Sequence, residues 1–170
     1  MASELKSVSI YDIKDNAFKL IADDWMLVTA GTPESFNTMT ASWGTLGELW
    51  NRKIAVCFVR PSRHTYQFME REDIFSLSFF DEQYRDALNF CGTKSGRDVD
   101  KMAHTGLIPV ASNHGTVYFE QARLVLVCRK LYIHDIDPGR FLDPKIEKQY
   151  PQKDYHRMYV GEILETLIRP

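Results

Sequence analysis

Two short stretches decide the fold of this chain: Asn37-Thr-Met-Thr-Ala-Ser-Trp-Gly44 and Arg60-Pro-Ser-Arg-His-Thr65. Between them lie a turn, expected near Trp50, and the apolar run Ile54 to Val59. If the segments on either side of the turn pair antiparallel, residue numbers across the ladder sum to roughly 100, which places Thr40 opposite Arg60. The two stretches would then meet at one end of a hairpin. A slip of one residue in the register would change which side chains face each other.

The second stretch carries positive charge at the start of a predicted helix, Ser62–Arg71, with Ser62 as its N-cap. A helix N-terminus is already positive and favours Asp or Glu, so Arg60 and Arg63 there suggest a bound anion. Backbone N–H groups, the hydroxyls of Ser62 and Thr65 and two guanidinium groups could converge on one phosphate. The alternative is that both Arg side chains are solvated or paired with nearby carboxylates, namely Glu70, Glu72 or Asp73.

The remaining pattern predicts many short strands and few helices. We expect strands at residues 25–32, 39–46, 54–60, 74–80, 117–120, 122–134 and 156–168. The strand at 74–80 alternates and is predicted to be half-buried, with Ser76 and Ser78 on its polar face. Further short helices are expected after the caps Asp81 and Asp98, the second ending at Thr105-Gly106, and the Pro-rich residues 138–151 are expected to form turns and short helical pieces. Without regular βαβ alternation, the chain suits a closed or nearly closed antiparallel barrel rather than a doubly wound sheet.

Composition limits the function classes. With 170 residues, of which 44% are apolar and 26% charged, we expect residues 1–170 to form one globular domain. A net charge of −2 gives no reason to expect nucleic acid or a membrane as partner. We find no signal peptide, no long apolar run and no spacing typical of a metal site. Three scattered cysteines then favour a reducing, cytoplasmic setting. No G-x-G-x-x-G, Walker A, H-E-x-x-H or G-x-S-x-G motif occurs, which argues against a Rossmann domain, a zincin and an α/β-hydrolase.

Two more motifs complete a family pattern. They are Cys91-Gly-Thr-x-Ser-Gly-Arg-Asp-Val-Asp-Lys101 and His156-Arg-Met-Tyr-Val-Gly-Glu-Ile163. Together with the two stretches above, in this order, they resemble the flavin reductase-like FMN-binding split-barrel proteins, and among these the flavoredoxin-type branch. The resemblance runs from about Trp25 to Ile163. It implies an all-β dominated fold, a split β-barrel of Greek-key type with inserted short helices.

The resemblance also implies a set of FMN-binding residues. In the first motif, Thr40 to Trp43 would line the isoalloxazine ring; the alternative is a barrel strand with a buried Trp. In the third motif, Gly96 permits positive φ or close approach of a ligand, and Arg97 and Lys101 would place positive charge near the reduced flavin; the alternative is a solvated cluster with Asp98 and Asp100. The full set is Asn37, Met39, Thr40, Ala41, Ser42, Trp43, Arg60, Ser62, Arg63, Thr65, Cys91, Ser95, Gly96, Arg97 and Lys101.

The implied activity is redox chemistry. His156 matches a family histidine on the nicotinamide side of the flavin, so His156 is the predicted catalytic residue and Tyr155 and His156 the predicted substrate-binding pair; the alternative is an ordinary strand histidine. We expect an NAD(P)H-dependent flavin reductase that passes electrons through FMN to an acceptor, and a homodimer with FMN near the interface. The main alternative is a non-enzymatic FMN-bearing electron carrier reduced by a redox partner protein. A reaction of the pyridoxamine phosphate oxidase type is a weaker alternative.

Overall fold

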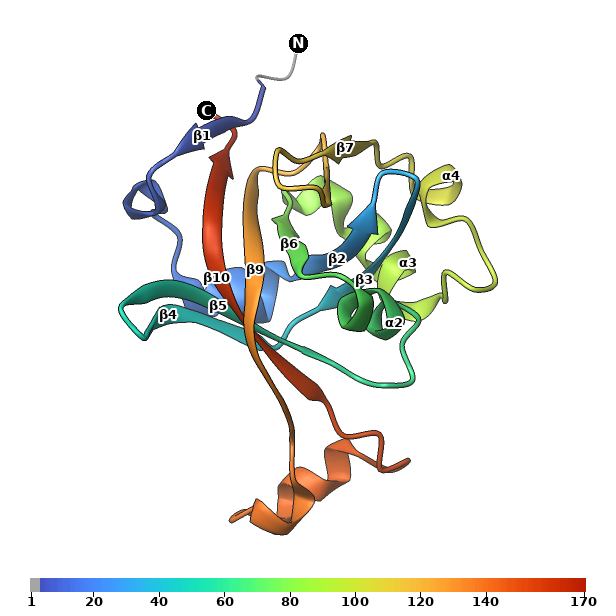
Figure 1. Ribbon diagram of the computed structural model, residues 1–170. Coiled ribbons are helices and arrows are strands. Elements are labelled where there is room, and N and C mark those ends of the chain that lie inside the picture. Colours follow the sequence, from blue (N-terminus) through green and yellow to red (C-terminus); the bar gives the residue numbers. More distant parts are fainter. Residues whose placement is uncertain (1–3) are drawn as a thin grey trace.

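One strongly curved antiparallel sheet forms the body of the protein (Figure 1). The computed structural model describes residues 4–170. The strand order is β3-β2-β6-β9-β10-β5-β4, and β1 pairs with β10. The strands are β1 (Lys6–Val8), β2 (Met26–Thr32), β3 (Ser35–Ala41), β4 (Gly44–Leu49), β5 (Arg52–Val59), β6 (Ile74–Phe79), β9 (Leu124–Asp135) and β10 (Arg157–Ile168). Within residues 4–170, no ladder joins the end strands β3 and β4, so the barrel is split between them. The predicted all-β dominated split barrel is confirmed.

The predicted hairpin is half right. Strands β4 and β5 do pair around Trp50 and Asn51, whose φ angles of 54° and 57° give the tight reversal that hairpins favour. The single strand expected at residues 39–46 is wrong, however, because the chain turns a corner at Ser42 and Trp43 and separates β3 from β4. The expected pairing of Thr40 with Arg60 is therefore also wrong: Thr40 lies opposite Leu27 of β2.

The helices are short, as expected, but their caps differ from the prediction. Helix α2 (Thr65–Arg71) begins after His64 and not after Ser62, because the Ser62 hydroxyl donates to Asp154 instead of capping a helix. The predicted cap Asp98 is also wrong, whereas Asp81 stands at the predicted N-cap position. Asp81 makes no side-chain cap for the 3-10 turn η3 (Glu82–Tyr84) that precedes α3 (Arg85–Thr93).

Helix α4 (Lys101–Thr105) is capped by Asp100, whose Oδ1 accepts from the N–H groups of Met102 and Ala103, each at 3.0 Å. It ends at Gly106 in the left-handed conformation, as predicted. The N-terminal segment adds η1 (Ile10–Asp12), α1 (Ala17–Lys19) and η2 (Leu20–Asp24), none of which the sequence analysis placed.

Two segments project from or cover the sheet. The 3-10 turns η4 (Pro138–Arg140) and η5 (Pro144–Gln149) lie in the segment between β9 and β10, residues 136–156, which extends away from the barrel and is called the arm below (Figure 1). The expected short helical pieces there are confirmed. A small second sheet of β7 (Pro109–Ala111) and β8 (Val117–Phe119) covers part of β6.

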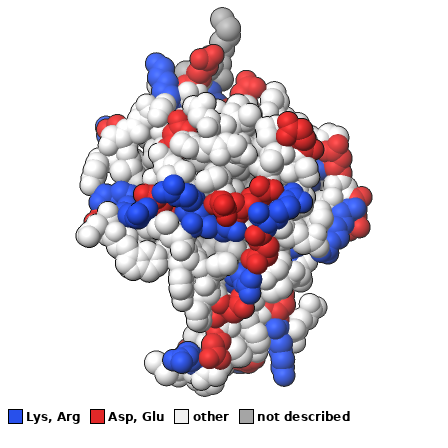
Figure 2. Space-filling model, viewed as in Figure 1, with Lys and Arg blue, Asp and Glu red and all other residues white. Residues whose placement is uncertain are grey.

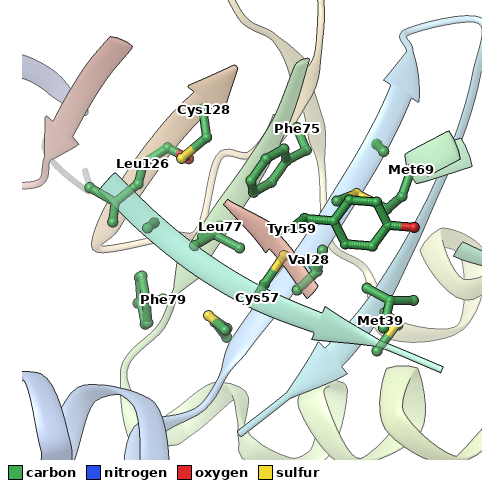
Figure 3. Packing of buried hydrophobic residues seen from close by; sticks show 14 of the residues in the cluster. Val28, Met39, Cys57, Met69, Phe75, Leu77, Phe79, Leu126, Cys128 and Tyr159 are labelled. Carbon is green, nitrogen blue, oxygen red and sulfur yellow. The ribbon is translucent and has the colours of Figure 1, made fainter. Parts of the chain in front are cut away.

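The barrel interior is filled by apolar side chains from strands far apart in sequence. Figure 3 shows Val28, Cys57, Leu77, Leu126 and Tyr159 converging from β2, β5, β6, β9 and β10, and all are buried. Burial of this apolar surface supplies the main driving force for folding.

The predicted half-buried strand β6 is buried on both faces. Ser76 and Ser78 are both fully buried, because β8 lies over the face that was expected to be exposed. The Ser76 hydroxyl donates to the Val117 carbonyl at 2.6 Å. Alternation alone indicates two faces but not what covers the second one.

Candidate functional site

A groove opens where the barrel is split. The end of β3, the corner at Ser42 and Trp43, the end of β5 and the start of β10 all border it. We call this space of about 160 Å³ the ring groove. It is lined by Met39, Thr40, Ala41, Ser42, Trp43, Phe58, Arg60, Arg63 and His156. Thus the two stretches that the sequence singled out do meet, although through the split of the barrel and not across a ladder.

A second space of about 200 Å³ adjoins the ring groove and shares Arg63 with it. We call it the cationic cavity. It is lined by Asn37, Ser62, Arg63, His64, Thr65, Gly92, Thr93, Lys94, Ser95 and Lys101. The second and third motifs, which are well separated in the chain, thus face each other across this cavity.

Two positive charges in this cavity lack an acidic partner. Arg63 donates to the Cys91 carbonyl at 3.2 Å, and Lys101 donates to the same carbonyl at 3.1 Å and to the Thr38 carbonyl at 2.6 Å. Within residues 4–170 neither forms an ion pair with a carboxylate. Burial, reinforced by Arg63, lowers the pKa of Lys101 to about 8, and burial with the nearby Arg60 lowers the pKa of Arg63. A buried charge without a counter-charge is costly, so the cavity favours an anion.

The walls of the cationic cavity are tightly fitted. Asn37 donates from Nδ2 to the Thr65 hydroxyl at 2.7 Å. A Cβ added to Gly96 would lie 2.0 Å from Oδ1 of Asn37, so only glycine fits there. Gly96 is required for this close packing and not for a positive φ, which it does not have. Nδ1 of His64 is buried and has no hydrogen-bond partner among the described residues, which leaves an unsatisfied polar atom in the wall.

Three other members of the predicted set behave differently from expectation. Arg97 is exposed and lines neither space, so the solvated-cluster interpretation fits Arg97 but not the buried Lys101. Cys91 is buried, and burial raises the pKa of its thiol, so the residue contributes its backbone carbonyl. The Thr40 hydroxyl donates to the Leu88 carbonyl of α3. The Ser42 hydroxyl is therefore the one from this motif that we expect to contact a ligand in the ring groove.

Arg60 lies at the edge of the ring groove, but its guanidinium group is held by the arm. Nη1 pairs with Asp154 at 2.9 Å, Nη2 donates to the Gln149 carbonyl at 2.9 Å, and the group stacks over the Tyr150 ring at 4.7 Å. Ser62 also binds Asp154, at 3.2 Å. The carboxylates considered from sequence are bound elsewhere: Glu70 by Arg157 and Tyr159, and Glu72 by Arg71. The sequence analysis missed Asp154, whose only signal was its closeness to His156 in the chain.

His156 sits at the other side of the ring groove in an aromatic setting. Its ring centroid lies 5.2 Å from that of Trp43 and 6.3 Å from that of Phe58. Burial, with a contribution from Arg60, lowers the pKa of His156 to about 4, so the imidazole is neutral at neutral pH. Trp43 is 44% exposed, which contradicts the alternative of a buried strand Trp.

The predicted companion of His156 is not its main contact. Tyr155 points into the arm, where its hydroxyl binds Glu147. The hydroxyl that reaches the His156 ring belongs to Tyr150 and lies 2.8 Å from Nδ1. Tyr150 lies six residues before His156 and outside the motif that begins there, so the motif did not point to it.

An apolar cavity of about 510 Å³ lies next to the ring groove, and Ser42, Trp43 and Phe58 form a shared wall. None of its lining residues is charged: they are Ala17, Phe18, Ile21, Ala22, Ser42, Trp43, Gly44, Thr45, Leu46 and Phe58. Four of these come from the N-terminal segment, which the sequence analysis did not include in the site. No group of three or more His, Cys, Asp or Glu side chains suited to a metal occurs among residues 4–170.

Comparison with known proteins assigns the chain to a family. Residues 18–170 match the flavin reductase like domain, so the protein belongs to the flavin reductase-like family, as the motifs suggested. No curated protein sequence matches significantly.

Solved structures share the fold. An FMN-binding domain of a flavin reductase-like enzyme from Shewanella baltica OS155 has a TM-score of 0.72 at 16% identity, covering 99% of this chain and 79% of that one. Flavoredoxin of Desulfovibrio vulgaris (Miyazaki F) has a TM-score of 0.66 at 21% identity, covering 85% and 68%. An NADH:FAD oxidoreductase of Streptomyces globisporus C-1027 has a TM-score of 0.65 at 16% identity, covering 84% and 73%. At these identities the similarity establishes the fold, and the arrangement of the site has to support the function.

Proposed function

We propose that this protein is an FMN-binding oxidoreductase that accepts electrons from NAD(P)H and passes them through the flavin to an acceptor. The observation that supports this most strongly is a pair of cations, the half-buried Arg63 and the buried Lys101, without a carboxylate partner among the described residues, at the end of a groove lined by small and aromatic residues. A bound phosphate would supply the missing negative charge, and the flat flavin ring would occupy the groove.

The cationic cavity is the proposed phosphate site. Arg63 and Lys101 would supply charge, and Ser62, Thr65 and Ser95 would supply hydroxyl groups. His64 also lines this cavity. Arg60 remains a proposed cofactor contact, but on the side of the ring groove, because its guanidinium group lies against Tyr150 and Asp154.

The ring groove is the proposed isoalloxazine site. Met39, Ala41 and Trp43 give apolar contact, while Ser42 offers a hydroxyl. The bound flavin would supply the redox chemistry, by taking up a hydride and releasing electrons. The protein would bind the flavin, orient it, and present His156 as a hydrogen-bond donor beside the ring. The adjoining apolar cavity gives an uncharged ring, such as nicotinamide, a place to approach.

The second candidate is an electron carrier without its own nicotinamide site. It is favoured by the exposed aromatic side chains at the rim of the apolar cavity, since Phe18 is 86% and Trp43 44% exposed and a protein partner could contact both. Flavoredoxin of Desulfovibrio vulgaris is one of the structural relatives, which keeps this candidate open.

We further propose that the protein is a cytoplasmic homodimer. The ring groove lies at an open edge of the barrel, so a second subunit could enclose the flavin. The three cysteines are free and buried, which suits a reducing compartment. No helix among the described residues is long and apolar enough to cross a membrane. Light scattering with and without FMN tests the dimer: a monomer that still binds FMN tightly would contradict a shared site.

Anaerobic stopped-flow spectroscopy separates the enzyme from the carrier. The FMN-loaded protein is mixed with NADH, NADPH or dithionite, and the long-wavelength flavin absorbance is followed. We expect bleaching with at least one nicotinamide and with dithionite. Bleaching with dithionite alone would support the carrier, whereas failure of the protein to bind FMN would reject both candidates.

A further inference from the structure

A tyrosine of the arm contacts His156, which lines the ring groove. Tyr150 follows η5, and the residue is only 4% exposed. Its hydroxyl lies 2.8 Å from Nδ1 of His156. Its ring lies against the guanidinium group of Arg60, at 4.7 Å, and is stacked on the ring of Phe141, at 6.1 Å. These contacts hold the phenol ring, and with it the hydroxyl, in place.

The hydrogen-bond directions follow from the partners available. Burial raises the pKa of the Tyr150 phenol, so the phenol keeps its proton at neutral pH. Tyr150 is almost fully buried, and among the described residues Nδ1 of His156 is the hydrogen-bond partner of its hydroxyl, so the phenol O–H donates to Nδ1. A neutral imidazole carries one N–H, so Nδ1 as acceptor places the N–H at Nε2.

The surroundings keep the imidazole neutral. Arg60 and Arg63 face His156 and disfavour a second proton, while Asp154 favours it but is already paired with Arg60. The ring itself is surrounded by Trp43 and Phe58.

We infer that Tyr150 is a positioning residue that holds His156 as a neutral imidazole with its N–H at Nε2, so that His156 acts as a hydrogen-bond donor toward the ring groove. This inference rests on the proposed function for its consequence in flavin reduction. A neutral donor orients a nicotinamide or flavin carbonyl without adding a third positive charge beside Arg60 and Arg63. It also means that His156 does not give up or take up a proton at neutral pH.

Arg60 has a role in this arrangement. Its bonds to the Gln149 carbonyl and to Asp154 hold both ends of the segment that carries Tyr150. Arg60 thus connects β5 of the barrel to the arm, and the stacked Tyr150 ring is the part of the arm that touches His156. The residue that the sequence suggested as a phosphate ligand is better placed to fix the tyrosine.

The test is the tautomer of His156, read by ¹⁵N NMR of the imidazole nitrogens in the protein without nicotinamide. The wild type should show N–H at Nε2 and an unprotonated Nδ1 from about pH 6 to pH 8. Tyr150→Phe keeps the stacked ring but removes the hydroxyl, and it should give a mixture of both tautomers. Tyr155→Phe is the matched control, because its hydroxyl binds Glu147 instead, and it should leave the His156 signals unchanged.

The functional readout follows on the same variants. Tyr150→Phe should bind FMN within about twofold of wild type, since one phenol hydroxyl outside the ring groove lining is lost, and should slow reduction by the active nicotinamide roughly 3- to 10-fold, the value of one neutral hydrogen bond. Dithionite reduction should not change.

Three results would overturn the inference: a wild-type N–H at Nδ1, a His156 tautomer unaffected by Tyr150→Phe, or nicotinamide reduction unaffected by Tyr150→Phe in a wild type that is reduced by nicotinamide. If the wild type is not reduced by either nicotinamide, the enzyme proposal fails, while the tautomer measurement still decides the role of Tyr150.

Discussion

Positive side chains on the outer face of this protein are paired with carboxylates, whereas Arg63 and Lys101 in its cationic cavity are not. Figure 2 shows Lys and Arg alternating with Asp and Glu in a belt across the middle of one face. Pairs on the outside of the sheet include Arg52 with Glu162 at 2.7 Å, Arg129 with Glu162 at 2.6 Å, and Arg157 with Asp135 at 2.6 Å. In the cavity, by contrast, Arg63 and Lys101 share the Cys91 carbonyl and have no carboxylate partner within residues 4–170.

This difference indicates where an anionic ligand is needed. Pairing on the surface is easy, and its contribution to stability is small. A buried Lys101 and a half-buried Arg63 without a counter-charge are expected to make the protein less stable without a ligand, and binding of an anion would offset that cost. Substituting charged residues in the cationic cavity and on the outer face tests whether this difference in charge pairing determines where an anion binds.

The strongest change is expected from Arg63→Ala. Loss of a charge-assisted hydrogen bond of about 1.5–3 kcal/mol should weaken FMN binding roughly 10- to 150-fold. Riboflavin lacks the phosphate, so it should bind wild type more weakly than FMN and lose little further affinity in the variant. Fluorescence titration measures both ligands. Arg129→Ala is the control from the outer face, and equal losses of FMN and riboflavin affinity in Arg63→Ala would rule out the phosphate assignment.

Lys101 should make FMN binding depend on pH. Its pKa is lowered to about 8 without ligand, and a bound phosphate should raise it again. Between these values the complex holds more protons than the free protein, so FMN affinity should fall as pH rises above about 8, by up to tenfold per pH unit. Titrations from pH 7 to pH 10 test this, with riboflavin as the control ligand; parallel pH profiles for the two flavins would contradict it.

The same lysine should make the ligand-free protein less stable at neutral pH. Unfolded, Lys101 keeps its proton up to about pH 10.5, whereas the folded protein loses it near pH 8, so the free energy of unfolding should rise across this window. Lys101→Met should remove that rise and stabilise the ligand-free protein at pH 7, while weakening FMN. Urea unfolding at several pH values measures the effect. A less stable Lys101→Met protein at pH 7 would show that the buried charge is already compensated.

His156→Ala should leave FMN bound and slow its reduction by NAD(P)H roughly 3- to 10-fold or more, because a hydrogen-bond donor beside the ring is lost. In the wild type, the rate should show no titration of His156 between pH 5.5 and pH 8, since its pKa is about 4. Dithionite reduction controls for damage to the flavin site. If reduction by nicotinamide is the same in the variant and the wild type, His156 is an ordinary strand residue.

Arg52→Ala is expected to have the smallest effect. The variant loses one partly exposed ion pair with Glu162, while Arg129 keeps that carboxylate paired. The free energy of unfolding should change by about 1 kcal/mol or less, with FMN affinity unchanged. Chemical unfolding and FMN titration check both, and a loss of FMN affinity would mean that charge on the outer face does reach the cavity.

Sequence reasoning found the family, the split barrel and most of the motifs that border the two spaces. It succeeded where the signal is local, as at the turn near Trp50 or the end of α4 at Gly106. It failed where a distant segment decides: Ser62 binds Asp154 instead of capping a helix, and Ser76 is buried under β8. Tyr150 and the N-terminal residues of the apolar cavity were missed for the same reason, because only the folded arm and the N-terminal helices bring them to the groove.

The most direct measurement is the pKa of Lys101 itself, followed by NMR of its side chain in the free protein, with FMN and with riboflavin. We predict a pKa of about 8 in the free protein, a clear rise when FMN binds, and little change with riboflavin. A pKa near 10.5 in the free protein, or the same shift with both flavins, would contradict the claim that the phosphate of FMN compensates the buried charge of Lys101.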